Sequence, residues 1–184
     1  MLKIWSMKQQ QQKEEAAQQG AGPKKKKVTP AQLRTQKDLA ELSLPHTMKM
    51  DFPNKDDILH FMLTISPDEG MYRGGTFRFD FTIGPNFPHE PPKVECREKM
   101  YHPNIDLAGK VCLNILREDW KPVLNLNAVI VGLQFLFLEP NPNDPLNEAA
   151  ARDLQEDRER FKRHVRTAMS GGMVMNVTYD RVTK

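Results

Sequence analysis

Residues 101–116 read YHPNIDLAGKVCLNIL, and the interpretation of the rest of the chain depends on them. The side-chain amide of Asn104 stands eight residues before the thiol of Cys112, and Gly109 permits a turn between them. This spacing can fold a donor for an oxyanion back toward a nucleophile. A cysteine packed in the core of a Val-Cys-Leu strand fits the local pattern equally well. A papain-like hydrolase, with His102 orienting the thiol, is a third interpretation, although the flanking residues lack the papain-type signature.

The composition points to an intracellular globular protein. The chain has 184 residues, of which 39% are hydrophobic and 28% charged, and this length suits one domain of ordinary size. No apolar run reaches the roughly 18 residues needed to span a bilayer, and the N-terminus lacks the apolar core of a secretory signal. Two cysteines in such a chain argue against a disulfide framework. We therefore expect a reducing environment, no membrane contact and no metal centre.

Basic residues gather in an N-terminal extension. Residues 1–28 hold seven lysines against two glutamates, a charge of +5 that leaves −2 for the remainder of a chain whose net charge is +3. The folded body therefore shows no basic bias that would indicate nucleic-acid binding. Lys24–Lys27 are a candidate nuclear-import signal, although we prefer to interpret them as a solvated charge run.

The extension itself divides into two parts. Residues 1–7 are mostly apolar, which favours a peptide that docks on a partner protein. Residues 8–27 are too poor in large apolar groups to offset the entropy lost on ordering. We therefore predict a flexible docking extension over 1–28 and a folded catalytic core over 29–184.

The core begins with a helix and continues with strands. Thr29 caps the helix, Pro30 takes its first turn, Gln32 completes a capping box, and Pro45 ends it. Apolar residues then alternate with polar ones in three short runs, which indicates an antiparallel meander with one wet face. These runs cover residues 59–65, 77–83 and 93–97. Cys96 falls on the apolar face of the last run, so we expect a buried structural thiol.

Helices are predicted for the second half of the core. Residues 97–126 have no long period and form an irregular segment around the second cysteine. Residues 128–138 are apolar almost all round, which predicts a buried central helix capped by Asn125 or Asn127. Residues 146–169 predict one or two charged helices.

Several motifs at matching spacing resemble the active-site signature of the ubiquitin-conjugating enzymes. They are Tyr101-His102-Pro103-Asn104, Cys112-Leu113-Asn114-Ile115-Leu116, Trp120-Lys121-Pro122, FPHEPPKV at 87–94 and PNPNDPL at 140–146. The resemblance covers about residues 29–170. It implies an α+β protein with the ubiquitin-conjugating-enzyme fold: an N-terminal helix, a four-stranded antiparallel meander, an active-site segment, and central and C-terminal helices. It also implies an acyltransferase without a cofactor, because the upstream activating enzyme consumes the ATP.

The resemblance implies a role for each matching residue. Cys112 corresponds to the cysteine that receives a modifier as a thioester and passes it to a lysine. Asn104 corresponds to an asparagine that steadies the oxyanion or the loop bearing it. Asp144 corresponds to an acidic residue near the incoming lysine, with capping of its Pro-rich turn as the alternative role. His102 and Pro103 correspond to structural positions of the catalytic loop.

Residues 1–10 and much of the body resemble the branch of this family that acts in neddylation. In that branch the extension docks in a groove of a heterodimeric activating enzyme, and its first residues enter a pocket of a co-ligase. The groove candidates are Ile4, Trp5 and Met7, and the pocket candidates are Met1 and Leu2.

The same resemblance implies partners and a location. We expect a monomer of the cytoplasm and nucleus that modifies lysines of cullins together with a RING-type ligase. The ligase-facing loop positions are His89, Lys121 and Pro122. Three alternatives stay open: a conjugating enzyme for ubiquitin itself, a non-catalytic interaction module on the same fold, and a cysteine hydrolase. Cys112 counts against the non-catalytic module, because such modules usually lack the cysteine.

Overall fold

The computed structural model describes residues 28–184. Several predictions made for the extension therefore lie outside the described residues. They are its flexibility, the docking candidates Met1, Leu2, Ile4, Trp5 and Met7, and the candidate import signal Lys24–Lys27. Within 28–184, no helix is both long enough and apolar enough to cross a membrane.

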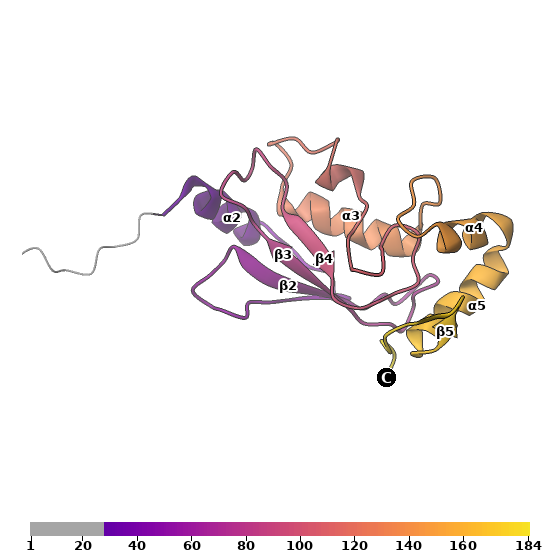
Figure 1. Cartoon of the computed structure of the whole chain (residues 1–184). Coiled ribbons are helices and arrows are strands. Elements are labelled where there is room, and N and C mark those ends of the chain that lie inside the picture. The colour runs from indigo at the N-terminus through magenta and orange to yellow at the C-terminus, as the bar shows by residue number, and fades with distance from the viewer. Residues whose placement is uncertain (1–27) are drawn as a thin grey trace, which may run out of the picture.

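An antiparallel sheet with helices around it forms the described part of the chain (Figure 1). The sheet follows chain order: β1 (Met48–Asp51), β2 (His60–Ile65), β3 (Phe77–Thr82) and β4 (Lys93–Cys96). The helices are α2 (Pro30–Ala40), the short 3-10 helix η1 (Asn114–Leu116), α3 (Leu126–Leu138), α4 (Glu148–Glu156) and α5 (Arg158–Met169). A hairpin of β5 (Met173–Val174) and β6 (Val177–Thr178) follows. In Figure 1, α2 lies at one end of the molecule, α4 and α5 at the other, and α3 between them. The predicted α+β class and order of elements are confirmed.

Helix α2 starts as predicted but ends earlier. Thr29 and Gln32 form both halves of the capping box. The helix ends at Ala40, five residues before the proline predicted to end it, because its last turn tightens and the N–H of Leu42 bonds to the carbonyl of Leu39 at 3.3 Å. The buried face also contains Asp38, which the apolar pattern did not indicate.

Large apolar side chains of β2 and β3 fill the core side of the sheet. Phe61 is opposite Phe81, and Leu63 is opposite Phe79, and all four side chains are at most 2% exposed. The predicted alternation of these strands is therefore correct. Cys96 at the end of β4 is buried as predicted, and burial raises the pKa of its thiol to about 12.

Helix α3 is buried on one face only, which corrects the prediction of a helix buried all round. Its N-cap is Asn125, whose side chain accepts a hydrogen bond from the N–H of Ala128 at 3.0 Å. Leu133 is fully buried, but Val131 and Phe135 are 54% and 59% exposed. These two side chains lie on the face that turns away from the core.

A single residue divides the charged C-terminal region into two helices. Asp157 is at once the C-cap of α4 and the N-cap of α5, where its side chain accepts from the N–H of Arg160 at 2.9 Å. Chain reversal after α5 uses Gly171, whose φ of +83° suits glycine.

Candidate active site

The His-Pro-Asn segment is a buried connector. His102 is fully buried, its Nε2 donates to the carbonyl of Leu136 at 2.9 Å, and its Nδ1 accepts from the N–H of Asn104 at 2.9 Å. Burial lowers the pKa of His102 to about 4, so the imidazole is neutral near pH 7. Both ring nitrogens are occupied, and the ring joins the segment to the end of α3.

Asn104 and Pro103 hold the loop that follows α3. The Asn104 amide donates to the carbonyl of Asn141 at 2.7 Å and accepts from its N–H at 2.9 Å. The carbonyl of Pro103 accepts from the N–H groups of Leu146 and Asn147 at 2.8 and 3.0 Å. The loop that carries Asp144 is therefore fastened at both ends to one short segment.

The backbone of the cysteine is fixed to the same segment and to the sheet. The N–H of Cys112 donates to the carbonyl of Asn104 at 2.7 Å. Gly109 has a φ of +87°, and a Cβ there would come 2.0 Å from the carbonyl oxygen of Cys96. Only glycine permits this close approach, so the predicted turn lets the active-site segment pack against β4.

The thiol of Cys112 lies in a small charged cluster. It donates to Oδ2 of Asp144 at 3.2 Å, and it accepts from Nη2 of Arg117 at 2.9 Å. The same guanidinium nitrogen lies 2.6 Å from Oδ2 of Asp144. The pKa of the thiol is raised, first by burial and then by its hydrogen bond to Asp144, while Arg117 opposes the rise. The resting group is therefore a neutral thiol.

Arg117 is the site residue that the sequence did not indicate. It lies five residues after the cysteine, in a segment whose sequence has no helical or strand periodicity. The next residue, Glu118, is also charged, so the sequence does not indicate which of the two side chains contacts the thiol. Asp144, its partner, is 27 residues further on. The pairing exists because η1 turns the chain back and the Asn104 contacts bring the 141–147 loop against it.

A cleft of about 200 Å³ opens beside the thiol. Leu113, Phe135 and Glu139 are among its lining residues, together with the cysteine itself. The cleft therefore places the exposed apolar ring of Phe135 and the sulfur of Cys112 on one lining. Within residues 28–184, no group of three or more His, Cys, Asp or Glu side chains could hold a metal ion.

The three ligase-facing candidates lie on two loops that the structure joins. His89, Lys121 and Pro122 are exposed. The indole N–H of Trp120 donates to the carbonyl of Pro88 at 2.8 Å, which links the loops. Arg34 of α2 adds a hydrogen bond to the carbonyl of Pro122 at 2.8 Å.

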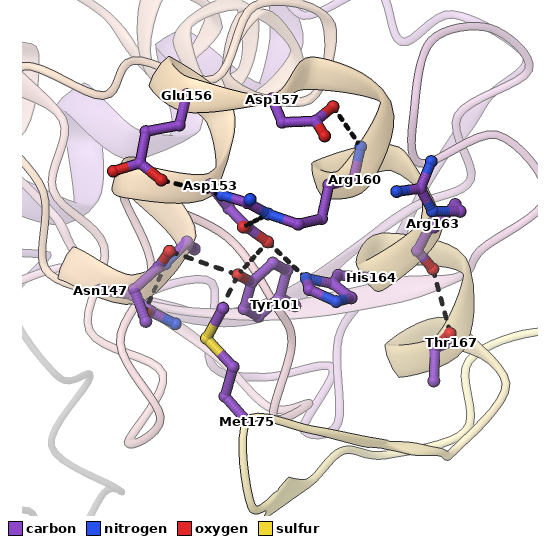
Figure 2. Close-up of polar contacts among 12 residues, drawn as sticks. Tyr101, Asn147, Asp153, Glu156, Asp157, Arg160, Arg163, His164, Thr167 and Met175 are labelled. Carbon is purple, nitrogen blue, oxygen red and sulfur yellow. Dashed lines mark hydrogen bonds and ion pairs between the residues drawn. The ribbon is translucent and has the colours of Figure 1, made fainter.

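A second polar cluster gathers around Asp153 and includes Tyr101 (Figure 2). Asp153 of α4 is 1% exposed and accepts from the hydroxyl of Tyr101 at 2.9 Å, and also from Arg160 and His164 of α5. Tyr101 directly precedes His102 in the chain. The cluster therefore ties α4 and α5 to the start of the His-Pro-Asn segment.

Comparisons with known proteins define the class. A family model described as ubiquitin-conjugating enzyme matches residues 34–169, so the chain belongs to this family. As a member it is an acyltransferase, which transfers a ubiquitin-like modifier through a thioester.

Similar proteins in several organisms carry a more particular name. The chain is 63% identical over 182 residues to the NEDD8-conjugating enzyme UBC12 of Yarrowia lipolytica, covering 99% of this chain and 98% of that one. It is 52% identical over 184 residues to the NEDD8-conjugating enzyme ubc12 of Schizosaccharomyces pombe, covering 99% of both. A solved structure of S. cerevisiae Ubc12 superimposes with a TM-score of 0.84 at 41% identity, covering 98% of each chain.

Proposed function

We propose that this chain receives NEDD8 from an activating enzyme as a thioester on Cys112 and transfers it to lysine amines of target proteins. The observation that carries this choice of modifier is the likeness over almost the whole chain to relatives named for NEDD8 conjugation. Ubiquitin as the modifier is less well supported, because the relatives that span the chain are named for NEDD8.

Loading and transfer follow from the cluster at the thiol. In loading, Cys112 loses its proton, its sulfur attacks the carbonyl carbon of the incoming thioester, and the thiolate of the activating enzyme leaves. Asp144 lies within hydrogen-bond distance of the proton that is lost. In transfer, an uncharged lysine amine attacks the same carbonyl carbon, the C–N bond forms and the C–S bond breaks. Asp144 orients the amine and takes its extra proton.

Asn104 acts in this scheme by holding the loop that carries Asp144. Both ends of its amide already bond to Asn141, so the group is engaged in the resting enzyme. His102 is neutral and bonded on both sides, so it serves the loop and takes no proton. The lack of a strong base next to the sulfur suits a carrier that must keep its thioester intact in water.

Partners are proposed for the two remaining surfaces. The loops with His89, Lys121 and Pro122 form a surface for a RING-type ligase, supported by their exposure and by the contacts that join them. The extension, with Ile4, Trp5 and Met7, would dock on a heterodimeric activating enzyme, and Met1 and Leu2 on a co-ligase. We further propose that the protein works as a monomer in the cytoplasm and nucleus, that cullins are its targets, and that it needs no cofactor of its own.

A charging assay tests the proposal. The full chain is mixed with ATP and either the NEDD8 or the ubiquitin activating enzyme with its modifier, and products are separated on a non-reducing gel. We expect a band sensitive to reducing agent with NEDD8, its loss in Cys112→Ala and its retention in Cys96→Ala. The Cys96 variant is the matched control because that thiol is also buried but lies on the sheet. Charging with ubiquitin alone would refute the choice of modifier.

A further inference from the structure

We propose that Arg117 is a gate for the acceptor lysine: its guanidinium holds the place that the incoming ammonium must take, and lysine displaces it. Arg117 is a positioning residue here, since it acts through Asp144. This inference rests on the proposed transfer to lysine amines.

Geometry places the gate where the acceptor must arrive. An attacking amine must come within roughly 3–3.5 Å of the thioester carbonyl, which is bonded to the sulfur of Cys112. Nη2 of Arg117 lies 2.9 Å from that sulfur and 2.6 Å from Oδ2 of Asp144. A lysine arrives as an ammonium, which must lose one proton to water before the uncharged amine attacks. The ammonium and this guanidinium nitrogen are both cationic donors to Oδ2 of Asp144, so they cannot share the position.

Exposure makes the gate easy to open. The side chains of Arg117 and Asp144 are 37% and 62% exposed, and an ion pair so open to water is weak. Glu118 offers the released guanidinium a second partner, since its Oε2 lies 3.8 Å from Nε of Arg117. A lysine that a partner protein holds at the cleft can therefore displace the arginine from Asp144. A free amine at low concentration competes less well with Arg117 for this carboxylate.

The same residue also acts on the free thiol. The charged groups around Cys112 are Asp144, Glu118 and Glu139, all anionic, and Arg117, the cation in contact with the sulfur. Arg117 lowers the pKa of the thiol, whereas Asp144 and Glu118 raise it, so removal of Arg117 raises the pH needed for loading. One side chain thus favours loading while it restrains transfer.

Arg117→Gln tests the gate in the full-length protein. Enzyme charged with modifier is isolated, and its discharge is measured against free L-lysine over a range of concentrations. We expect the lysine concentration for half-maximal rate to fall by ~2–5-fold, the size of a weak surface pair, with the maximal rate unchanged. Loading should shift to higher pH, and Arg117→Lys should restore part of each effect.

Two controls make the test specific. Arg97→Gln removes an arginine from a similarly exposed pair, with Asp80 at 2.7 Å on the sheet, and should change neither measurement. In an Asp144→Asn background, Arg117→Gln should no longer change the lysine dependence, because the two cations then have no carboxylate to compete for.

Several results would overturn the gate. They are an unchanged lysine dependence in Arg117→Gln, a lower maximal rate at saturating lysine, or an undiminished effect in the Asp144→Asn background. The assay works with whichever modifier the enzyme accepts. Failure to charge with NEDD8 therefore counts against the proposed function, whereas failure of the lysine test counts against the gate alone.

Discussion

Asn104→Ala separates a loop-holding role from direct donation to the oxyanion. The substitution removes two hydrogen bonds to Asn141, at 2.7 and 2.9 Å, from a side chain that is 2% exposed. Each such bond contributes about 0.5–1.5 kcal/mol net, so we expect a loss of about 1–3 kcal/mol in the free energy of unfolding. For a chain of this length that corresponds to a fall in Tm of roughly 2–4 °C per kcal/mol.

Transfer should fall as well, but through Asp144. When the 141–147 loop loosens, its carboxylate no longer meets the amine at a fixed distance, and a misplacement of about 1 Å can cost ~10²-fold in rate. Discharge of the charged enzyme to L-lysine measures this fall. In an Asp144→Asn background, Asn104→Ala should lower the discharge rate little further, since the carboxylate that Asn104 positions is already absent.

Asn125→Ala is the matched control for stability. Asn125 caps α3 with one hydrogen bond at 3.0 Å, so its loss should cost about 1 kcal/mol without changing discharge. If Asn104→Ala left the unfolding midpoint unchanged, or kept its full effect on discharge beside Asp144→Asn, the amide would act on the oxyanion and would not act by holding the loop.

Three further predictions concern stability and the thiol. Gly109→Ala should destabilise the fold by at least ~2 kcal/mol in urea unfolding, since a Cβ meets the carbonyl of Cys96 at 2.0 Å with φ at +87°; a neutral effect would contradict the close approach. Burial alone would raise the pKa of Asp153, but its three hydrogen-bonding partners lower it, so the carboxylate is stabilised in the folded state. Asp153→Asn removes this buried charge from its cationic partners and should lower the free energy of unfolding by ~3–5 kcal/mol at pH 7. That difference should shrink as the pH falls through the lowered pKa, and a difference independent of pH would refute the linkage. Iodoacetamide should label Cys112 slowly at pH 7 because the pKa of its thiol is raised. Asp144→Asn should lower that pKa and speed the labelling, with alkylation measured by mass spectrometry. Slower labelling of the Asp144→Asn protein would show that Asp144 does not raise the pKa of the thiol.

Local chemistry made much of the fold predictable from sequence. The capping box at Thr29 involves residues three apart, and the alternation over 77–83 reflects a single strand with one buried face. Patterns of this kind depend only on residues close together in the chain, so the structure agrees with what they predict. β1 was harder to predict, because its four residues MKMD alternate weakly. The β5–β6 hairpin turns through Met175 and Asn176, both at positive φ, and methionine gives no signal for such a turn.

Errors arose where tertiary packing decided the outcome. No apolar pattern marks Asp38 as buried, yet it is 4% exposed and accepts from Arg34 at 2.8 Å and from the N–H of Leu126 at 3.1 Å. Phe135 looked buried because its neighbours are apolar, yet it faces the cleft beside the cysteine. Apolar character does not reveal which side of a helix another element covers.

The sequence by itself determined the order of the elements, the turn at Gly109 and, through its motifs, the family, and it predicts Cys112 as the nucleophile. Only the tertiary structure decided what surrounds the sulfur. Arg117 and Asp144 are separated by 27 residues, and their charges meet over Cys112 because the Asn104 amide fastens one loop against another. Contacts of this kind depend on how separate segments pack, so the periodicity of side chains along the sequence does not predict them.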